Sequence, residues 1–397
     1  MQKEYSLSKL LDLPTAEKES LGIAHTLPEI LQQPRMWRQT YQKIANLAGP
    51  INTFLQNAGI GTARQALLKV YLVGAGTSDY IGKSVCALLQ REWGCDVQAI
   101  PSTDLLTNIE DHVVPNHDYL WISFSRSGDS SEGVAVLEAA LEFYPQIRHV
   151  IVTCNQQGKM ARSFHGRENL FSIVLDDQVN DRGLAMTSSF SNMVVVAQAL
   201  AHFRTLSAYG PIVETLAASA TQTLPVVAST CERLVSEGFA KVCFLGTGSL
   251  KGAAIESALK VLELSGGRVM SLAESFLGLR HGPLSAIDSD TLIVVFLSAD
   301  PRRRAFELDL VHEICDKELT SKCLIVTSEK VENTRLLIKD SLSFELREEI
   351  SDLYLPPLFV LVGQLLGLFA SLRQGLKPDE PSPRGAISRV VSHVTIH

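Results

Sequence analysis

The chain has 397 residues, of which 46% are hydrophobic and 20% are charged, and its formal net charge is −7. This composition excludes a largely disordered chain and a collagen-like repeat, and the length suits two domains of ordinary size. A mildly acidic chain without basic blocks is poorly suited to binding phosphate backbones, so no nucleic-acid partner is expected.

Residues 354–372 form an uncharged apolar segment that is long enough to cross a bilayer. Pro356 and Pro357 near its start and Gln364 in its middle argue against that role, so we expect a buried core helix and no membrane partner. The polar N-terminus lacks an apolar signal core, and the seven scattered cysteines show no C-x-x-C spacing. We therefore expect a cytoplasmic protein without disulfides or structural zinc.

The first 44 residues are predicted to form short helices punctuated by prolines, with a helix over 36–48 that leads into the rest of the chain. Beyond them the chain repeats itself at an offset of 172 residues. The offset aligns residues 70–76 with 242–248, 97–100 with 269–272 and 120–124 with 292–296, and with two residues inserted it aligns 150–153 with 324–327.

Each repeat is predicted to be strand, Gly-rich turn, helix, strand, loop, strand, helix and strand. The strands are continuous apolar runs, which is typical of parallel strands buried on both faces. The fold class is therefore α/β, with two tandem doubly wound parallel sheets from an internal duplication. We expect an N-terminal helical segment over 1–44, domains over 45–205 and 206–376, and a C-terminal tail over 377–397.

Small hydroxylated residues follow the first and third predicted strands of the first repeat. Ligands bind at the carboxyl ends of such strands, where hydroxyls and helix N-terminal amides suit a phosphomonoester. The alternative is that Ser78 and Ser130 are only helix caps. A dinucleotide site is disfavoured because Asp79 stands where its fingerprint needs glycine, and no P-loop sequence occurs. The candidate phosphate-binding residues are Gly76, Thr77, Ser78, Ser125, Ser127 and Ser130, and Arg126 either adds a charged contact or points to solvent.

The second repeat keeps the Gly-rich turn at residues 246–249 but lacks the serine cluster, so one full and one degenerate site are expected. Its predicted helix over 250–265 carries Glu256, Lys260 and Glu263 on one face among apolar residues. A surface ion pair would explain this pattern. The apolar surroundings instead favour a cleft, where the lysine keeps both carboxylates ionised and one of them acts as general base.

His281 lies in the loop Arg280-His281-Gly282-Pro283, soon after the carboxylate helix. It is either an ordinary turn residue or a proton-transfer group, since imidazole titrates near neutral pH. No metal-ligand spacing appears among the ten histidines, so neither a metal nor another cofactor is expected.

These motifs resemble tandem SIS (sugar isomerase) domains, as in the isomerase half of glucosamine-6-phosphate synthase. A likeness over nearly the whole chain, to the bacterial galactosamine-6-phosphate deaminase/isomerases (also called tagatose-6-phosphate ketose/aldose isomerases), is carried by residues 181–189, 256–264, 278–283 and 389–391. The resemblance implies that the hydroxylated loops hold a 6-phosphate, that Glu263 is the enolisation base oriented by Glu256 and Lys260, and that His281 opens the sugar ring.

The resemblance also implies a homodimer or homotetramer with sites at subunit interfaces and a sugar 6-phosphate as the small-molecule partner. The expected reaction converts galactosamine 6-phosphate to tagatose 6-phosphate and ammonia. Isomerisation without deamination, glucosamine-6-phosphate deamination and a non-catalytic phosphosugar sensor stay open. The synthase has a lysine in its C-terminal tail, and the matching stretch here, around Ser392, has none.

Overall fold

The computed structural model describes residues 5–164, 166–329, 340–382, 384–391 and 394–396. It divides into two compact units, each built around one of the two repeats. The first-repeat unit consists of Arg35–Asp181, Ser188–Val213 and Ser388–His397, and the second-repeat unit consists of Met1–Pro34, Arg182–Thr187 and Glu214–Ile387. The domain boundaries expected from the sequence stay a prediction.

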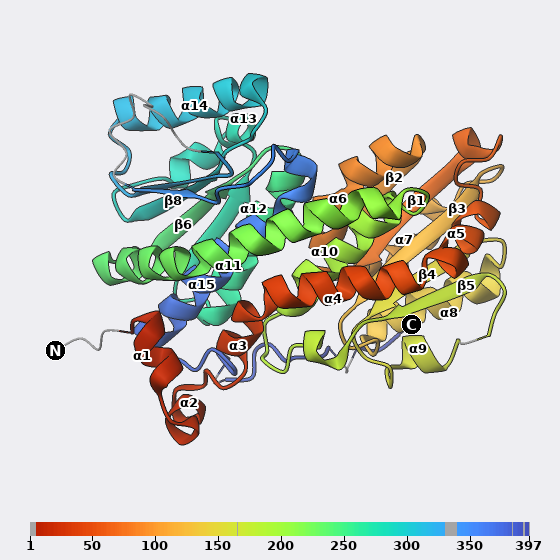
Figure 1. Cartoon of the computed structure of the whole chain (residues 1–397), viewed down its shortest axis with the longest axis horizontal. Coiled ribbons are helices and arrows are strands. Elements are labelled where there is room, and N and C mark those ends of the chain that lie inside the picture. The colour runs from red at the N-terminus through yellow and green to blue at the C-terminus, as the bar shows by residue number, and fades with distance from the viewer. Residues whose placement is uncertain (1–4, 165, 330–339, 383, 392–393, 397) are drawn as a thin grey trace. The chain divides into compact units, whose positions relative to one another are not determined.

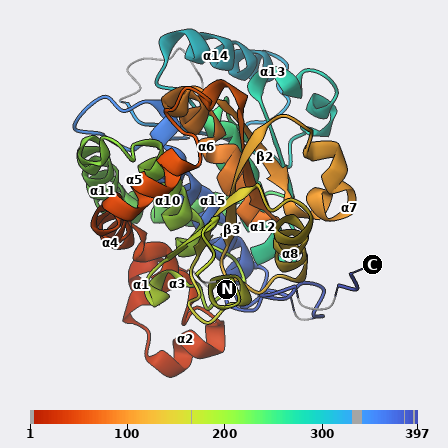
Figure 2. The same ribbon diagram turned by 90° about the vertical axis from the view of Figure 1, so that its right-hand side faces the viewer.

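The first-repeat unit contains a sheet of five parallel strands in the order β2-β1-β3-β4-β5 (Figure 1). Helices α7 and α8 lie on one side of this sheet, and α6 and α10 lie on the other (Figure 2). The strands are β1 (Leu68–Gly74), β2 (Asp96–Pro101), β3 (Asp118–Ser125), β4 (Arg148–Thr153) and β5 (Leu170–Val174). The helices are α5 (Ala48–Asn57), α6 (Thr77–Trp93), α7 (Ser102–His112), α8 (Ser131–Phe143), α9 (Lys159–Arg162) and α10 (Ser188–Ala201).

The second-repeat unit contains a second sheet of five parallel strands in the order β10-β9-β8-β6-β7. Its strands are β6 (Lys241–Leu245), β7 (Met270–Glu274), β8 (Thr291–Phe296), β9 (Cys323–Thr327) and β10 (Asp340–Ser343). Its helices are α1 (Leu7–Asp12), α2 (Thr15–Leu21), α3 (Thr26–Leu31), α12 (Ser249–Leu264), α13 (Phe276–Leu279), α14 (Pro301–Asp316) and α15 (Pro356–Arg373). Helices α4 (Gln33–Asn46) and α11 (Leu206–Glu237) have residues in both units.

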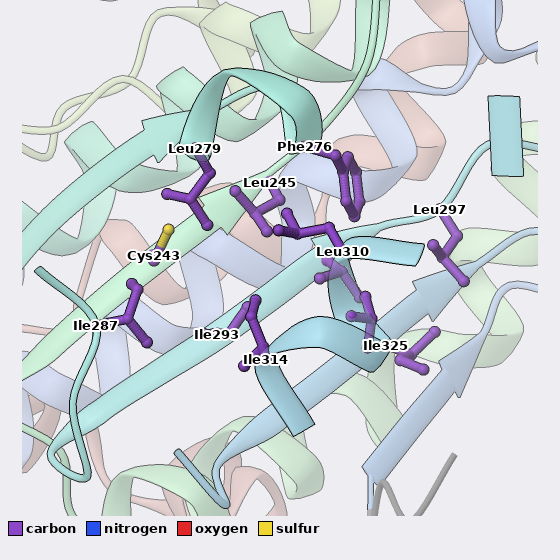
Figure 3. Packing of buried hydrophobic residues seen from close by; sticks show 12 residues of the cluster. Cys243, Leu245, Phe276, Leu279, Ile287, Ile293, Leu297, Leu310, Ile314 and Ile325 are labelled. Carbon is purple, nitrogen blue, oxygen red and sulfur yellow. The ribbon is translucent and has the colours of Figure 1, made fainter. Parts of the chain in front are cut away.

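A compact apolar core joins one face of the second sheet to α13 and α14 (Figure 3). Cys243 and Leu245 of β6 contribute to it, and Phe276 and Leu279 of α13 are almost fully buried in it. Because both ends of α13 are anchored in this core, the loop that begins at Arg280 has a fixed starting point.

The internal duplication is confirmed in the backbone of the two Gly-rich turns. Gly76 has φ 55° and ψ −125°, and Gly248, its counterpart 172 residues later, has φ 59° and ψ −128°. Side chains rarely tolerate this positive φ, so glycine is required at both turns. The predicted α/β class with two doubly wound parallel sheets is therefore confirmed.

Two features extend the prediction. Each sheet has a fifth strand, β5 or β10, and each loop between the second and third strands holds a helix, α7 or α13. Within the described ranges, α15 is the one helix long and apolar enough to cross a membrane. Of this 18-residue segment, 94% is buried inside the protein. The predicted buried core helix is thus confirmed, and it packs along α12.

Candidate active site

In the first-repeat unit, the hydroxylated loops lie together at one edge of the sheet. Strands β1 and β3 are parallel neighbours with Val73 opposite Ser123, so their carboxyl ends share this edge. The chain leaves β1 for β2 on one side and resumes at β3 on the other, which makes this the switch point of the sheet. Ligands of open α/β sheets bind in the crevice at such a point.

Thr77 and Ser78 occupy the first turn of α6, directly after the strained turn at Gly76. Both are buried. The N-cap of α6 is Gly76, so Ser78 is the second residue of the helix and does not cap it. The sequence alternative that Ser78 serves as the helix cap is thus wrong.

The end of β3 and the loop that follows it present three further serines. Ser125 Oγ accepts a hydrogen bond from the backbone N–H of Gly128 at 3.0 Å, and Ser127 Oγ accepts one from Asp129 at 3.2 Å. Since these hydroxyls act as acceptors toward the loop, their O–H groups remain available to donate to a ligand. Ser130 stands at the cap position of α8, but its side chain makes no capping hydrogen bond.

Arg126 points into the protein and not to solvent. Its side chain is buried, and Nη2 donates to the carbonyl oxygen of Arg389 at 2.5 Å. Arg389 in turn donates to the Asp181 carbonyl and to Asn180 Oδ1, each at 2.8 Å. The backbone N–H of Ser131 donates to Val391 O at 3.3 Å, so the tail is tied to the start of α8 in its own unit. Ser392 itself lies outside the described residues.

In the second-repeat unit, α12 brings Glu256, Lys260 and Glu263 together, as their spacing predicts. Lys260 Nζ lies 2.5 Å from Glu263 Oε2 and 3.3 Å from Glu256 Oε1. The side chains of Lys260 and Glu256 have no exposed surface, whereas 22% of the Glu263 side chain is exposed. The surface ion pair considered from the sequence is therefore wrong, because the lysine lies inside the protein.

The charge of Lys260 is maintained by its neighbours. Burial alone lowers the pKa of the Lys260 ammonium, but the two carboxylates of Glu256 and Glu263 outweigh burial, and the pKa of Lys260 is raised. An ammonium held between two carboxylates in a dry environment fixes the position of both. Only Glu263 also reaches accessible space, so it is the carboxylate that can exchange a proton with a ligand.

Glu263 lines a cavity of about 700 Å³ within the second-repeat unit. Other lining residues are Leu259, Leu262, Gly266, Gly267, Arg268, Leu376, Pro381, Ser382, Arg384, Ala386 and Ile387. Gly266 has φ 58°, and a Cβ there would lie 2.9 Å from the carbonyl oxygen of Pro381, so glycine permits the close approach of the tail. Residues 376–387 were not expected at this site from the sequence. The double glycine at 266–267 and the apolar tail residues were the only sequence features that pointed to it.

His281 lies on the exposed turn after α13. Its backbone N–H donates to Gly278 O at 3.0 Å, and the neighbouring Arg280 donates to Glu313 Oε2 at 2.6 Å. The imidazole is exposed, and among the described residues it makes no hydrogen bond or ion pair. His281 is therefore not in contact with the Glu263 carboxylate in this chain, although both belong to the second-repeat unit.

No group of three or more histidine, cysteine, aspartate or glutamate side chains suited to a metal ion occurs in the part of the chain that the structure describes. The chemistry available from these residues is proton transfer beside a carboxylate and hydrogen bonding to an anion. The second-repeat unit offers the first of these and the first-repeat unit offers the second.

No protein-family model matches the chain. It is 35% identical over 388 residues to the D-galactosamine-6-phosphate deaminase AgaS of Escherichia coli O157:H7, covering 94% of this chain and 95% of that protein. It is 32% identical over 403 residues to the deaminase of the same name from Shewanella sp., covering 99% and 97%. A crystal structure of a tagatose-6-phosphate ketose/aldose isomerase from Escherichia coli superimposes with a TM-score of 0.84, at 32% identity over 94% of this chain and 96% of that one.

Proposed function

Because the chain belongs to the family of the D-galactosamine-6-phosphate deaminases, which act on amino sugar phosphates, we propose that it converts galactosamine 6-phosphate and water to tagatose 6-phosphate and ammonia. The observation that carries this proposal is the Glu256–Lys260–Glu263 triad. A buried lysine holds one carboxylate at the wall of a cavity, which is an arrangement suited to a general base.

The phosphate group is assigned to the first-repeat unit. Its support is the switch point between β1 and β3, where Thr77, Ser78, Ser125, Ser127 and Ser130 gather with Gly76. The Ser130 hydroxyl, which makes no capping hydrogen bond, and the O–H groups of Ser125 and Ser127 supply hydrogen-bond donors. Arg126 contributes by holding the tail, through its bond to the Arg389 carbonyl.

The proposed reaction begins with ring opening. His281 moves a proton from the C1 hydroxyl to the ring oxygen, which gives the open-chain aldehyde. Glu263 then removes the C2 proton while the C1 oxygen takes a proton from water, which gives an enolamine. Glu263 returns its proton to C1, which gives a positively charged ketimine at C2. Water adds to the ketimine carbon, the C–N bond breaks, and ammonia leaves with the proton it needs, so the product is the 2-ketose phosphate.

Glu256 and Lys260 are positioning residues in this scheme. Through the ion pair with Lys260 they fix the direction of the Glu263 side chain, and they do not themselves line the cavity. With an aldose phosphate that has a hydroxyl at C2 in place of the amino group, the same two proton transfers would give the ketose directly. No ketimine would form, and no ammonia would be released. A phosphosugar sensor would need the hydroxylated loops but not the buried triad, which is why an enzyme is favoured.

We also propose a cytoplasmic homodimer or homotetramer whose sites lie at subunit interfaces. The support is that His281 is exposed and its side chain makes no hydrogen bond or ion pair among the described residues, while Leu277, on the same segment, is 46% exposed. An apolar side chain beside an unengaged histidine suits a surface that a second copy of the chain covers.

The test is an ammonia-release assay with galactosamine 6-phosphate, glucosamine 6-phosphate and N-acetylgalactosamine 6-phosphate, with ketose 6-phosphate measured in parallel. Equal amounts of ammonia and ketose from the galacto compound are expected. Greater release from the gluco compound would move the substrate assignment but keep the mechanism. A phosphosugar that raises the melting temperature without any ammonia would overturn deamination in favour of isomerisation or sensing.

A further inference from the structure

The loop that follows β8 in the second-repeat unit encloses a carboxylate supplied by the chain itself. The backbone N–H of Ala299 donates to Asp352 Oδ1 at 2.8 Å, and the Ser298 hydroxyl donates to Asp352 Oδ2. The Arg303 guanidinium lies 3.1 Å from the same Oδ2. Asp352 is only 3% exposed, so its carboxylate is a buried anion satisfied by a backbone amide, a hydroxyl and a cation.

This loop is the counterpart of the serine loop in the first repeat. The offset of 172 residues places Ser298 at the position of Arg126 and Ala299 at that of Ser127. Strands β6 and β8 are also parallel neighbours on either side of a switch point, like β1 and β3. The duplicated fold therefore places these two loops at the same edge of both sheets, and in the second repeat a carboxylate of the chain itself is bound there.

A second buried carboxylate lies beside the first. The backbone N–H of Ser298 donates to Glu307 Oε2 at 2.8 Å, and Glu307 is 1% exposed. Ala299 also lines a cavity of about 520 Å³, whose wall carries Arg347 as well as Glu329, Glu345, Glu348 and Glu349. Glu329 is paired with Arg304 at 2.8 Å. A phosphate group approaching this edge would meet a loop whose donors are already used by Asp352 and Glu307.

We propose that Asp352 is an internal ligand that permanently occupies the anion site of the second repeat, so that removal of its side chain opens a site for a small carboxylate. The consequence that each chain binds one phosphosugar rests on the proposed function; the internal-ligand proposal does not. The second repeat thereby uses the donors of this loop to fasten the segment that leads into α15.

The first experiment is anion rescue of the Asp352→Ala variant, followed as melting temperature in sodium formate against sodium chloride at equal ionic strength. The variant is expected to melt on the order of 5 °C below the wild-type protein in chloride. Formate should restore a large part of that loss with a saturable dependence on concentration, because the formate carboxylate reaches the donors that Asp352 used. A response to formate no larger than that of the wild-type protein overturns the proposal.

Two matched variants control for general effects. Asp300→Ala removes an exposed carboxylate from the same loop and leaves no buried cavity. Asp300 Oδ1 accepts a hydrogen bond from the backbone N–H of Arg303 at 2.9 Å. Asp352→Asn removes the charge but keeps the volume. Neither should show saturable rescue by formate. If Asp352→Ala is recovered only unfolded, refolding yields in formate and chloride are compared, and equal yields contradict the proposal.

Binding stoichiometry separates this inference from the proposed function. Titration calorimetry of the wild-type protein with galactosamine 6-phosphate should give one site per chain, and two sites per chain would contradict the closed second repeat. If no phosphosugar binds, the proposed function fails, whereas formate rescue still decides whether Asp352 is an internal ligand.

Discussion

Lys260 Nζ lies 2.5 Å from Glu263 Oε2, one turn along the same helix, with the lysine fully buried and the glutamate partly exposed. This pair joins the interior of the second-repeat unit to the wall of its cavity. If the lysine moved away, both carboxylates would lose their cation, and that of Glu256 would be left unpaired inside the protein. The buried lysine is also held by the residues packed around it, so packing as well as charge determines the direction of the Glu263 side chain.

Replacing Glu263 by glutamine should abolish turnover but keep substrate binding. The amide preserves shape and hydrogen bonding but cannot accept the C2 proton, so kcat should fall by about 10²-fold or more. Ammonia release measures the loss, and the shift in melting temperature with galactosamine 6-phosphate measures binding. Glu237→Gln, an exposed change on α11, is the control. Turnover like that of the wild-type protein in Glu263→Gln would remove this residue from the mechanism.

Replacing Lys260 by methionine should strongly destabilise the protein. It leaves the buried carboxylate of Glu256 without its cation, which costs about 3–5 kcal/mol of unfolding free energy. Adding Glu256→Gln should recover a large part of the loss, because the second change removes the unpaired charge. Urea unfolding of the two single variants and the double variant measures this coupling, and strictly additive effects would contradict it.

The raised pKa of Lys260 also predicts how stability depends on alkaline pH. The folded protein binds this proton more tightly than the unfolded chain, so the contribution is complete below the unfolded pKa and is lost as pH rises through the folded value. The wild-type protein should lose stability at alkaline pH more steeply than the Lys260→Met/Glu256→Gln variant. Equal slopes in unfolding experiments would show that Lys260 does not carry this dependence.

His149 on β4 should make the protein sensitive to acid. Its side chain is completely buried next to Trp121, neither ring nitrogen has a hydrogen-bond partner among the described residues, and burial lowers the pKa of His149 to about 3. The folded state therefore binds this proton less readily than the unfolded chain. Stability is complete above pH 6.5 and falls as pH drops toward 3, by up to about 1.4 kcal/mol per pH unit.

His149→Leu should flatten this acid dependence, because leucine has no proton to bind. Urea unfolding between pH 4 and pH 7 measures the slope. His312→Gln, a change at an exposed histidine on α14, should leave the slope unaltered. An unchanged slope in His149→Leu would show that other groups cause the loss of stability in acid.

Much of the fold could be predicted because buried parallel strands have a distinct sequence. The apolar runs at β1 and β6, each followed by glycines, are similar enough to reveal the duplication. Strands β5 and β10 could not be paired in this way, since the aligned segments end before them. Helix α11 contains Pro211 and Pro225, which a local pattern takes as breaks, and tertiary packing overrides that signal.

The candidate site was predictable where its residues are close in sequence. A spacing of four and three predicted the Glu256–Lys260–Glu263 contacts, because the geometry of one helix fixes them. Local pattern could not show that Asp352 occupies the loop at Ala299, since that contact joins residues about 50 positions apart. The same holds for Arg126 and Arg389, whose pairing depends on where the tail runs.

Helix α12 is held in place by close packing against α15, and a substitution at Gly363 of α15 tests this packing. A Cβ at Gly363 would lie 2.3 Å from Ser257 Cβ, so Gly363→Ala must push the two helices apart. A loss of about 1–3 kcal/mol of unfolding free energy is expected. Gly49→Ala is the matched control, since a Cβ there meets nothing within 4 Å. Adding Ser257→Gly to Gly363→Ala should restore part of the stability, and failure of both variants to differ from wild type would rule out close packing at this point.

Ser130 separates phosphate binding from helix capping. Its hydroxyl makes no capping hydrogen bond, so Ser130→Ala should leave the melting temperature nearly unchanged. If the hydroxyl donates to the substrate phosphate, KM should rise by about tenfold, since a hydrogen bond to a charged group contributes about 1.5–3 kcal/mol. Asp300→Ala is the opposite case, because the Asp300 carboxylate does cap α14 and its loss should lower the melting temperature. A Ser130→Ala protein that melts early but keeps its KM would identify this serine as a cap and would remove it from the phosphate site.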